Sequence, residues 1–221
     1  MPIRLPHMTE IHLPASLVIV LVAAAIPLGW GVARLLHHVL GTPVPTLLLI
    51  VADVAAATWA AASLPHTLLL PVSCALGWVL AALAVADLVA YRLPDVLTLP
   101  LIAAGLVVSR LLPDPDLAGH AIGAVLGFGI FAAVAVAYRN LRGREGLGLG
   151  DAKLAAAAGA WLGWQALPSV VLVAALGGIL WVALRYLIQG RASLGERIAF
   201  GVPLCAAFWL AWIYGPLLPL T

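Results

Sequence analysis

The chain has 221 residues, of which 64% are hydrophobic and only 9% are charged, and its mean hydropathy is +1.14. A water-soluble domain cannot bury so large a share of apolar residues, so the composition excludes a soluble protein and indicates an integral membrane protein. The formal net charge of +2 is small, which gives no reason to expect nucleic acid as a partner.

Apolar runs separated by breaks of Pro, Gly or charged residues predict an all-α polytopic bundle of about eight transmembrane helices, with six to eight spans possible. The fourth and sixth runs are short for a membrane crossing, and the Leu167–Pro168 step is either a turn or a kink. We expect a single membrane domain over residues 1–221, with neither a large soluble appendage nor a cleavable signal peptide. The predicted segments are 14–36, 46–63, 67–90, 97–112, 118–138, 151–167, 168–188 and 199–217.

The basic residues predict the orientation of these helices. If the N-terminus lies outside, the outer side keeps only Arg4 and Arg110, together with the acidic Asp114 and Asp116. This bias is what the positive-inside rule requires, and it places the end of the third span and the start of the sixth in the cytosol. The basic residues on the cytosolic side are then Arg34, Arg92, Arg139, Arg142, Arg144, Lys153, Arg185, Arg191 and Arg197.

Asp87 lies in the apolar end of the third predicted span, between Ala86 and Leu88. A charged side chain at the centre of a membrane helix costs about 2.5–3.5 kcal/mol on insertion scales, so such residues usually have a function. Arg92 is five residues away, which is poor spacing for an ion pair within a helix. This spacing favours a functional role for Asp87 over a structural ion pair.

Asp151 follows two glycines, Gly148 and Gly150, at the start of the sixth predicted span. Glycines at these positions remove side chains that would block a second carboxylate or a substrate backbone. An aspartate at a helix start can equally cap the helix by accepting hydrogen bonds from free backbone N–H groups. The pattern alone leaves both roles open.

The two aspartates together suggest an aspartic peptidase at the membrane surface. Two carboxyl groups in a partly dry site share one proton, because both cannot ionise easily. The ionised carboxylate can take a proton from water while the neutral one hydrogen-bonds the scissile carbonyl. Cys74 and Cys205 lie in separate apolar runs and form no Cys-x-x-Cys motif, so we expect no metal and no cofactor.

Three stretches resemble the bacterial prepilin peptidases, also called type IV leader peptidases. Asp87 followed by Leu93 to Pro100 (LPDVLTLP) resembles their first active-site segment. Glu145 to Leu154 (EGLGLGDAKL), which continues into Gly159 to Trp164 (GAWLGW), resembles the second, the Gly-x-Gly-Asp segment. Ile198 to Pro203 (IAFGVP) is similar to a late Phe-Gly-Pro segment, so that the resemblance covers most of residues 70–210.

The resemblance implies an intramembrane aspartic endopeptidase with Asp87 and Asp151 as its catalytic pair. It would remove short basic leaders from prepilins or pseudopilins at the cytosolic face of the bacterial inner membrane, with membrane lipid around it. Many family members also carry a cysteine-rich insertion and methylate the new N-terminus. Only Gly41 to Pro45 separates the first two predicted spans here, and the cysteine tetrad is missing, so the resemblance favours a peptidase without methyl transfer.

Other polar residues receive secondary roles. We expect Asp95 to cap the fourth helix and Lys153 to reach the interface or to steady Asp151. For Glu145 we expect a solvated loop charge, with attraction of a basic leader as the alternative. Asp53, inside the second span, is expected to make a buried polar contact, with Thr58 or with a neighbouring helix.

Two alternatives to this peptidase remain at the level of sequence. A presenilin-like protease also uses a Gly-x-Gly-Asp segment, but the last spans contain no Pro-Ala-Leu motif. A small ion- or proton-coupled transporter would instead use Asp53, Asp87 and Asp151 as a relay or as a cation site.

Overall fold

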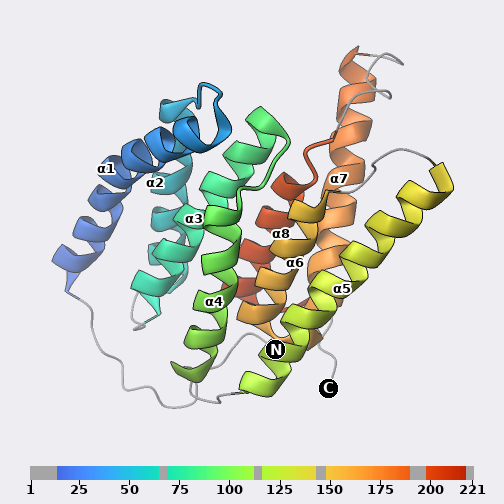
Figure 1. The fold of residues 1–221 in the computed structure, drawn as a ribbon. Helices are drawn as coiled ribbons and strands as arrows, with labels where there is room; N and C mark the ends of the chain where they lie inside the picture. Colours follow the sequence, from blue (N-terminus) through green and yellow to red (C-terminus); the bar gives the residue numbers. More distant parts are fainter. Residues whose placement is uncertain (1–13, 65–68, 112–115, 143–147, 190–197, 218–221) are drawn as a thin grey trace.

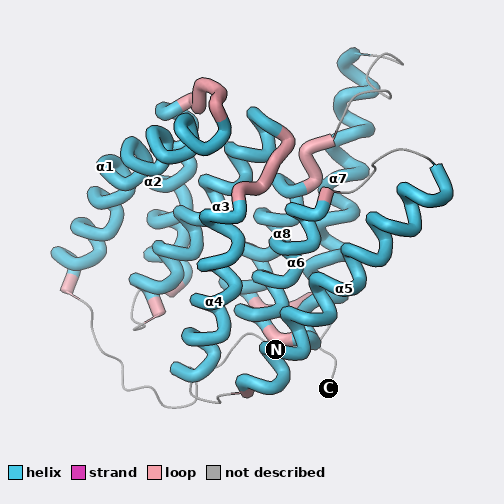
Figure 2. Tube along the Cα trace, in the orientation of Figure 1, coloured by secondary structure: helices cyan, strands magenta, loops and turns pink. Residues whose placement is uncertain are grey.

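The computed structural model describes residues 14–64, 69–111, 116–142, 148–189 and 198–217. Within these ranges every regular element is helical and no strand occurs, which confirms the predicted polytopic helical membrane bundle (Figure 2). Its elements are α1 (Ala15–Leu40), α2 (Thr46–Ser63), α3 (Leu70–Ala90), α4 (Asp95–Leu111), α5 (Leu117–Arg142), α6 (Leu149–Leu162), the 3₁₀ turn η1 (Trp164–Ala166), α7 (Leu167–Gln189) and α8 (Gly201–Tyr214).

Among the described residues, five helical stretches are long and apolar enough to cross a membrane, namely α1, α2, α3, α5 and η1 joined to α7. The predicted short fourth and sixth segments are helices of 17 and 14 residues, and α8, at 14 residues, is shorter than its predicted segment. Helix α6 ends at its C-cap Gly163, whose φ of 79° is a conformation that residues other than glycine rarely adopt. A turn follows, and α7 begins at the Leu167–Pro168 step. The chain is therefore a multi-pass membrane protein.

Helix α6 forms the centre of the bundle. It packs against α4, α5, α7 and α8, while α1 and α2 stand to one side against α3 (Figure 1). Almost every residue of α6 from Asp151 to Trp161 is buried. The alanine-rich sequence of this helix is suited to that position, because small side chains let neighbouring helices approach from several sides.

Glycines set the distance between α5 and α6. A Cβ on Gly159 would collide with the carbonyl of Gly123, and a Cβ on Gly127 would collide with the carbonyl of Ala155. Helices in a membrane associate through such close packing, since lipid supplies no hydrophobic force between them. The contact holds α6 firmly against α5 and thereby positions the start of α6.

Indole groups fasten α6 and α8 to the neighbouring helices. Trp161 Nε1 donates to the Leu101 carbonyl of α4 at 2.8 Å, and Trp212 Nε1 donates to Ser73 Oγ of α3 at 2.9 Å. The two indole rings meet edge to face, with centroids 5.2 Å apart. These contacts satisfy both buried N–H groups, which would otherwise be costly in an apolar interior.

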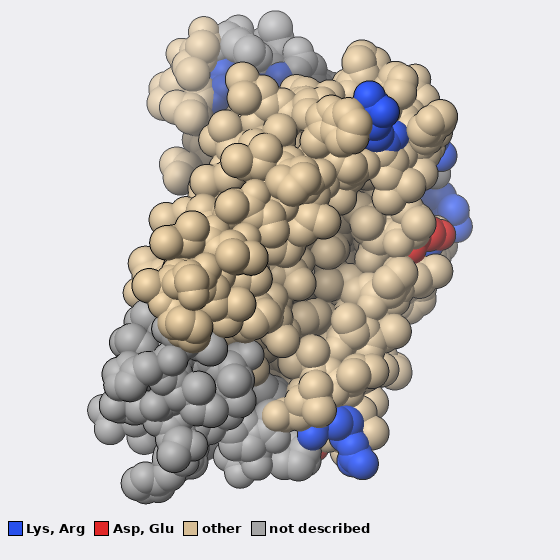
Figure 3. Space-filling view, turned by 90° about the vertical axis from the view of Figure 1, so that its left-hand side faces the viewer, with Lys and Arg blue, Asp and Glu red and all other residues tan. Residues whose placement is uncertain are grey.

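The described basic residues gather at one end of the bundle. Arg34, Arg92, Arg139, Lys153 and Arg185 all lie near the helix ends at that side, and Arg110 lies near the opposite end. Figure 3 shows basic atoms on the upper part of one face and near its lower end, with a broad uncharged area between. An uncharged band of this kind is what the hydrocarbon of a bilayer requires.

Candidate active site

Asp87 occupies the last turn of α3 and is only 6% exposed. The helix ends four residues later, where the Tyr91 N–H donates to the Asp87 carbonyl at 2.9 Å. Tyr91 has φ 51° and ψ 37°, the left-handed conformation that ends many helices but is unusual for a bulky residue. The turn at Tyr91 leads the chain back over the end of α3, above the Asp87 side chain.

Two backbone amides approach the Asp87 carboxylate from another helix. The backbone N–H groups of Gly201 and Val202, at the start of α8, lie near it, while Asp87 Oδ2 is buried and accepts no hydrogen bond among the described residues. A Cβ on Gly201 would lie 2.8 Å from Asp87 Oδ2 and 3.3 Å from Leu93 Cδ1. Glycine is needed at position 201 because any larger residue would push into this carboxylate.

Asp151 lies in the first turn of α6 and is 8% exposed. The helix begins two residues earlier, at Leu149, and its N-cap is Gly148, which makes no side-chain cap. The Asp151 N–H donates to the Gly148 carbonyl at 3.1 Å. Asp151 is therefore not the N-cap residue itself, but from the first turn its carboxylate can still accept from free backbone N–H groups, so both roles stay open.

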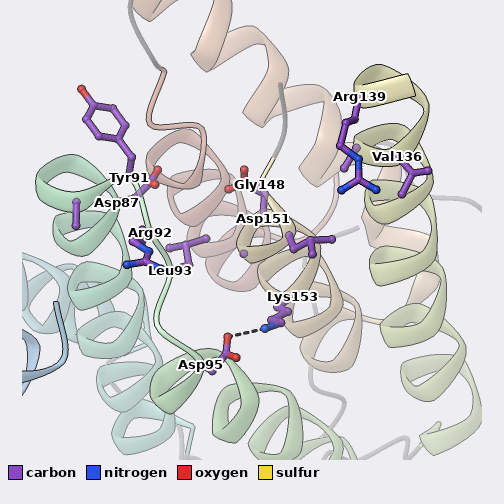
Figure 4. Close-up of a pocket in the computed structure, with 14 residues that line it drawn as sticks. Asp87, Tyr91, Arg92, Leu93, Asp95, Val136, Arg139, Gly148, Asp151 and Lys153 are labelled. Atoms are coloured by element: carbon purple, nitrogen blue, oxygen red, sulfur yellow. Dashed lines mark hydrogen bonds and ion pairs between the residues drawn. The ribbon is translucent and has the colours of Figure 1, made fainter. Parts of the chain in front are cut away.

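Asp87 and Asp151 line the same pocket, which has a volume of about 680 Å³. Figure 4 shows the two carboxylates on different helices at the top of this pocket. The predicted site residues Gly148, Gly150 and Lys153 line it too, as does Asp95. Glu145 lies outside the described residues, so its predicted role stays a prediction.

The two predicted glycines differ in what they do. A Cβ on Gly150 would lie 3.0 Å from Leu93 Cβ, which is tighter than most contacts, so glycine lets the connector between α3 and α4 rest on the start of α6. A Cβ on Gly148 would meet nothing closer than Asp151 Oδ2 at 3.6 Å, and its φ of −77° is ordinary. The described packing therefore requires a glycine at position 150 and not at 148.

Asp95 and Lys153 form an ion pair, in which Lys153 Nζ and Asp95 Oδ1 are 2.6 Å apart (Figure 4). Asp95 is the first residue of α4, and the carbonyl of Pro94 accepts the first helical N–H groups. The predicted N-cap at Asp95 is thus a residue within the helix whose carboxylate binds a lysine instead. Lys153 likewise contacts Asp95, which neither of its predicted roles included.

Asp53 lies apart from the pocket, in the middle of α2. Its side chain is 1% exposed, and Oδ1 has no hydrogen-bond partner among the described residues. Of the two predicted partners, Thr58 is wrong, because its hydroxyl donates to the Val54 carbonyl at 2.7 Å, while the contact with a neighbouring helix stays a prediction. Helix α1 passes close to this carboxylate, since a Cβ on Gly29 would lie 2.8 Å from Oδ2.

Sequence reasoning did not find several groups of the pocket. Arg92 and Arg139 line it from opposite sides, so that three cationic and three carboxylate side chains of the described chain surround one cavity. From the sequence, Arg139 is a marker of topology, and Arg92 is a marker of topology and a poorly spaced ion-pair partner of Asp87, but neither is predicted as a residue of the pocket. Gly201 had been noted only within a late motif, and nothing local in the sequence shows that it contacts Asp87.

The arrangement suits acid–base chemistry on a polar backbone substrate. Two buried carboxyl groups face one cavity, and no trio of His, Cys, Asp or Glu side chains in the described part of the chain gathers as a metal site. The cavity opens at the end of the bundle where the basic residues collect. A flexible segment near the membrane surface could therefore reach the carboxylates from water.

Comparison with known proteins relates the chain to one family. The model of the Type IV leader peptidase family matches residues 74–183, about half of the chain, and this match includes Asp87 and Asp151. Proteins named "Prepilin leader peptidase/N-methyltransferase" are similar to shorter stretches. The one from Dickeya chrysanthemi is 55% identical over 65 residues, which is 29% of this chain and 23% of the relative.

Two further relatives of the same name are similar to stretches of comparable length. The Aeromonas salmonicida (strain A449) protein is 48% identical over 80 residues, 36% of this chain and 27% of the relative. The Escherichia coli (strain K12) protein is 47% identical over 74 residues, 32% of each chain. The similar stretches thus span about a quarter to a third of these relatives. No solved structure matches.

Proposed function

Because the chain belongs to the type IV leader peptidase family, we propose that it is an aspartic endopeptidase that removes leader peptides from prepilins or pseudopilins. The observation that carries this proposal is the shared pocket of Asp87 and Asp151. Each aspartate comes from a different segment of the chain, and the cavity between them is large enough for an extended peptide. The active site would face the cytosol from the bacterial inner membrane, since the basic ends of the helices surround it.

The carboxyl pair would act as a unit on a bound water. The ionised carboxylate takes a proton from water, and the water oxygen attacks the scissile carbonyl carbon. The neutral carboxyl hydrogen-bonds the carbonyl oxygen as negative charge develops there. The tetrahedral intermediate then collapses as the leaving amine takes a proton, and the peptide bond breaks. Because the two groups are coupled, each proton belongs to the pair.

The surrounding residues would hold this pair in place. Gly201 lies directly against the Asp87 carboxylate, and Leu93 fills the space between Gly150 and Gly201. The Asp95–Lys153 ion pair joins the start of α4 to the start of α6, near both carboxylates. Preorganisation of this kind supports catalysis, because the reacting groups need no rearrangement at the moment of reaction.

We propose cleavage without methyl transfer. The relatives' printed names include N-methyltransferase activity, but the stretches similar to this chain cover only 23–32% of each. The two cysteines of this chain, Cys74 and Cys205, are both buried in helices of the bundle. They do not resemble the paired cysteines of a cytosolic insertion.

A transporter built on three aspartates is less well supported by the geometry. Asp53 does not line the pocket that Asp87 and Asp151 share, so the three do not form one relay among the described residues. Asp53 therefore offers a matched control, since it is a buried intramembrane carboxylate outside the proposed site.

The test is leader cleavage in membranes. The chain would be co-expressed with a prepilin from the same genome as wild type, Asp87→Asn, Asp151→Asn and Asp53→Asn, and the pilin mass would be followed. We expect cleavage by the wild type and by Asp53→Asn, and none by either pocket variant. Cleavage that survives in Asp87→Asn or Asp151→Asn would remove that residue from the pair.

A further inference from the structure

A second concave surface lies beside the pocket, on α7. It is a groove of about 720 Å³, whose floor is one face of α7 from Ala175 to Tyr186 and whose wall is formed by Ile198 and Phe200. At a rise of about 1.5 Å per residue this floor is about 16 Å long, close to half the thickness of the hydrocarbon. Apart from the Tyr186 hydroxyl, the side chains that line it are apolar.

The floor of the groove is suited to an α-helix. Gly178 is buried, and Ala175 and Ala183 are small, while Ile179 is 66% exposed. Small residues on one helix face let a second helix approach closely, and apolar packing then replaces contacts with lipid. Gly178 has room to spare, because a Cβ there would lie 3.6 Å from the Phe200 ring, an ordinary contact.

Neighbouring residues of the chain link the groove to the catalytic pocket. Phe200, in the groove wall, directly precedes Gly201, whose N–H faces Asp87. The Phe200 ring also meets Phe131 of α5, with centroids 6.4 Å apart. One turn further along α5, Ala135 lines the pocket. A substrate chain that leaves the carboxylates along Phe200 toward α7 would reach the groove.

The two surfaces differ in charge in a way that fits one amphiphilic substrate. The pocket carries six charged side chains of the described residues, and the groove carries none. Building on the proposed function, we propose that the groove on α7 docks an apolar helical segment of the substrate that directly follows the scissile bond. The pocket then holds the polar stretch at the membrane surface, and the groove fixes how far the scissile bond stands above the bilayer.

Photo-crosslinking tests which molecule occupies the groove. Benzoyl-phenylalanine would replace Ile179 in the groove, and the matched control would carry it at Leu184, which is 48% exposed and lies on the other side of α7. In membranes that contain a full prepilin, we expect crosslinks to the prepilin or its cleaved product from position 179 and not from position 184. Crosslinks from 179 only to lipid, or only to a second copy of the chain, would overturn the proposal.

Kinetics provide an independent readout. Gly178→Leu would fill the groove, and Leu184→Trp would add bulk on the control side. Each variant would cleave both a full prepilin and a short peptide that ends before the apolar helix. We expect Gly178→Leu to lower the ratio of kcat/KM for prepilin over peptide by about tenfold, and Leu184→Trp to leave it unchanged. An unchanged ratio for Gly178→Leu, in a folded protein, would overturn the proposal.

Failure of the groove and failure of the peptidase are separable in these experiments. If the wild type cleaves prepilin but position 179 captures no substrate, only the docking proposal fails. If the wild type cleaves neither substrate, the peptidase proposal fails. In that case the docking proposal falls with it, whatever is crosslinked at position 179.

Discussion

Replacing Gly201 with alanine should damage catalysis far more than folding. The new Cβ would lie 2.8 Å from Asp87 Oδ2 and 3.1 Å from its Cγ, whereas ordinary contacts begin at 3.4 Å. The Asp87 carboxylate must then move by about 0.6 Å, and misplacement of reacting groups by about 1 Å can cost a hundredfold in rate. We expect kcat for prepilin cleavage to fall by about 10- to 100-fold, or roughly 1.4–2.7 kcal/mol of transition-state stabilisation.

The assay would measure kcat and KM for prepilin cleavage by the purified protein, together with its thermal unfolding. Gly129→Ala is the matched control, since a Cβ on Gly129 of α5 meets nothing within 4 Å. This control should cleave like the wild type and be slightly stabilised, because alanine favours a helix over glycine by about 1 kcal/mol. A Gly201→Ala protein that is folded and cleaves at the wild-type rate would refute the placement of Asp87 against α8.

Three further predictions follow from the same packing. A double-mutant cycle on Asp95 and Lys153 should give a coupling in stability below about 1 kcal/mol, since both side chains are partly exposed; a much larger value in a denaturation assay would contradict a solvated pair. Gly159→Ala should lower the melting temperature clearly, because the new methyl group meets the carbonyl of Gly123; an unchanged melting curve would mean that α5 and α6 are less tightly packed. The pH profile of kcat/KM should be bell-shaped, since the coupled carboxyls work only when they share one proton; a profile without an acid limb would argue against the pair.

The sequence alone determined where the helices lie and which acidic residues needed explanation. Each apolar run predicted one helix, because hydropathy is a local property of the sequence. The second segment, 46–63, coincides with α2, while α1 and α5 run past the apolar runs to Leu40 and Arg142. Asp87 and Asp151 stood out because a carboxylate is costly at the edge of hydrocarbon, whatever the fold.

Only the tertiary structure decided which residues meet. Lys153 contacts Asp95, 58 positions earlier, and Gly201 lies against Asp87, far back in the chain. In a membrane bundle the lipid-facing and buried sides of a helix are both apolar, so periodicity says little about which face turns inward. The partners of Asp87, the packing of Leu93 on Gly150 and the groove on α7 depend on helix stacking. Local sequence patterns do not predict that stacking.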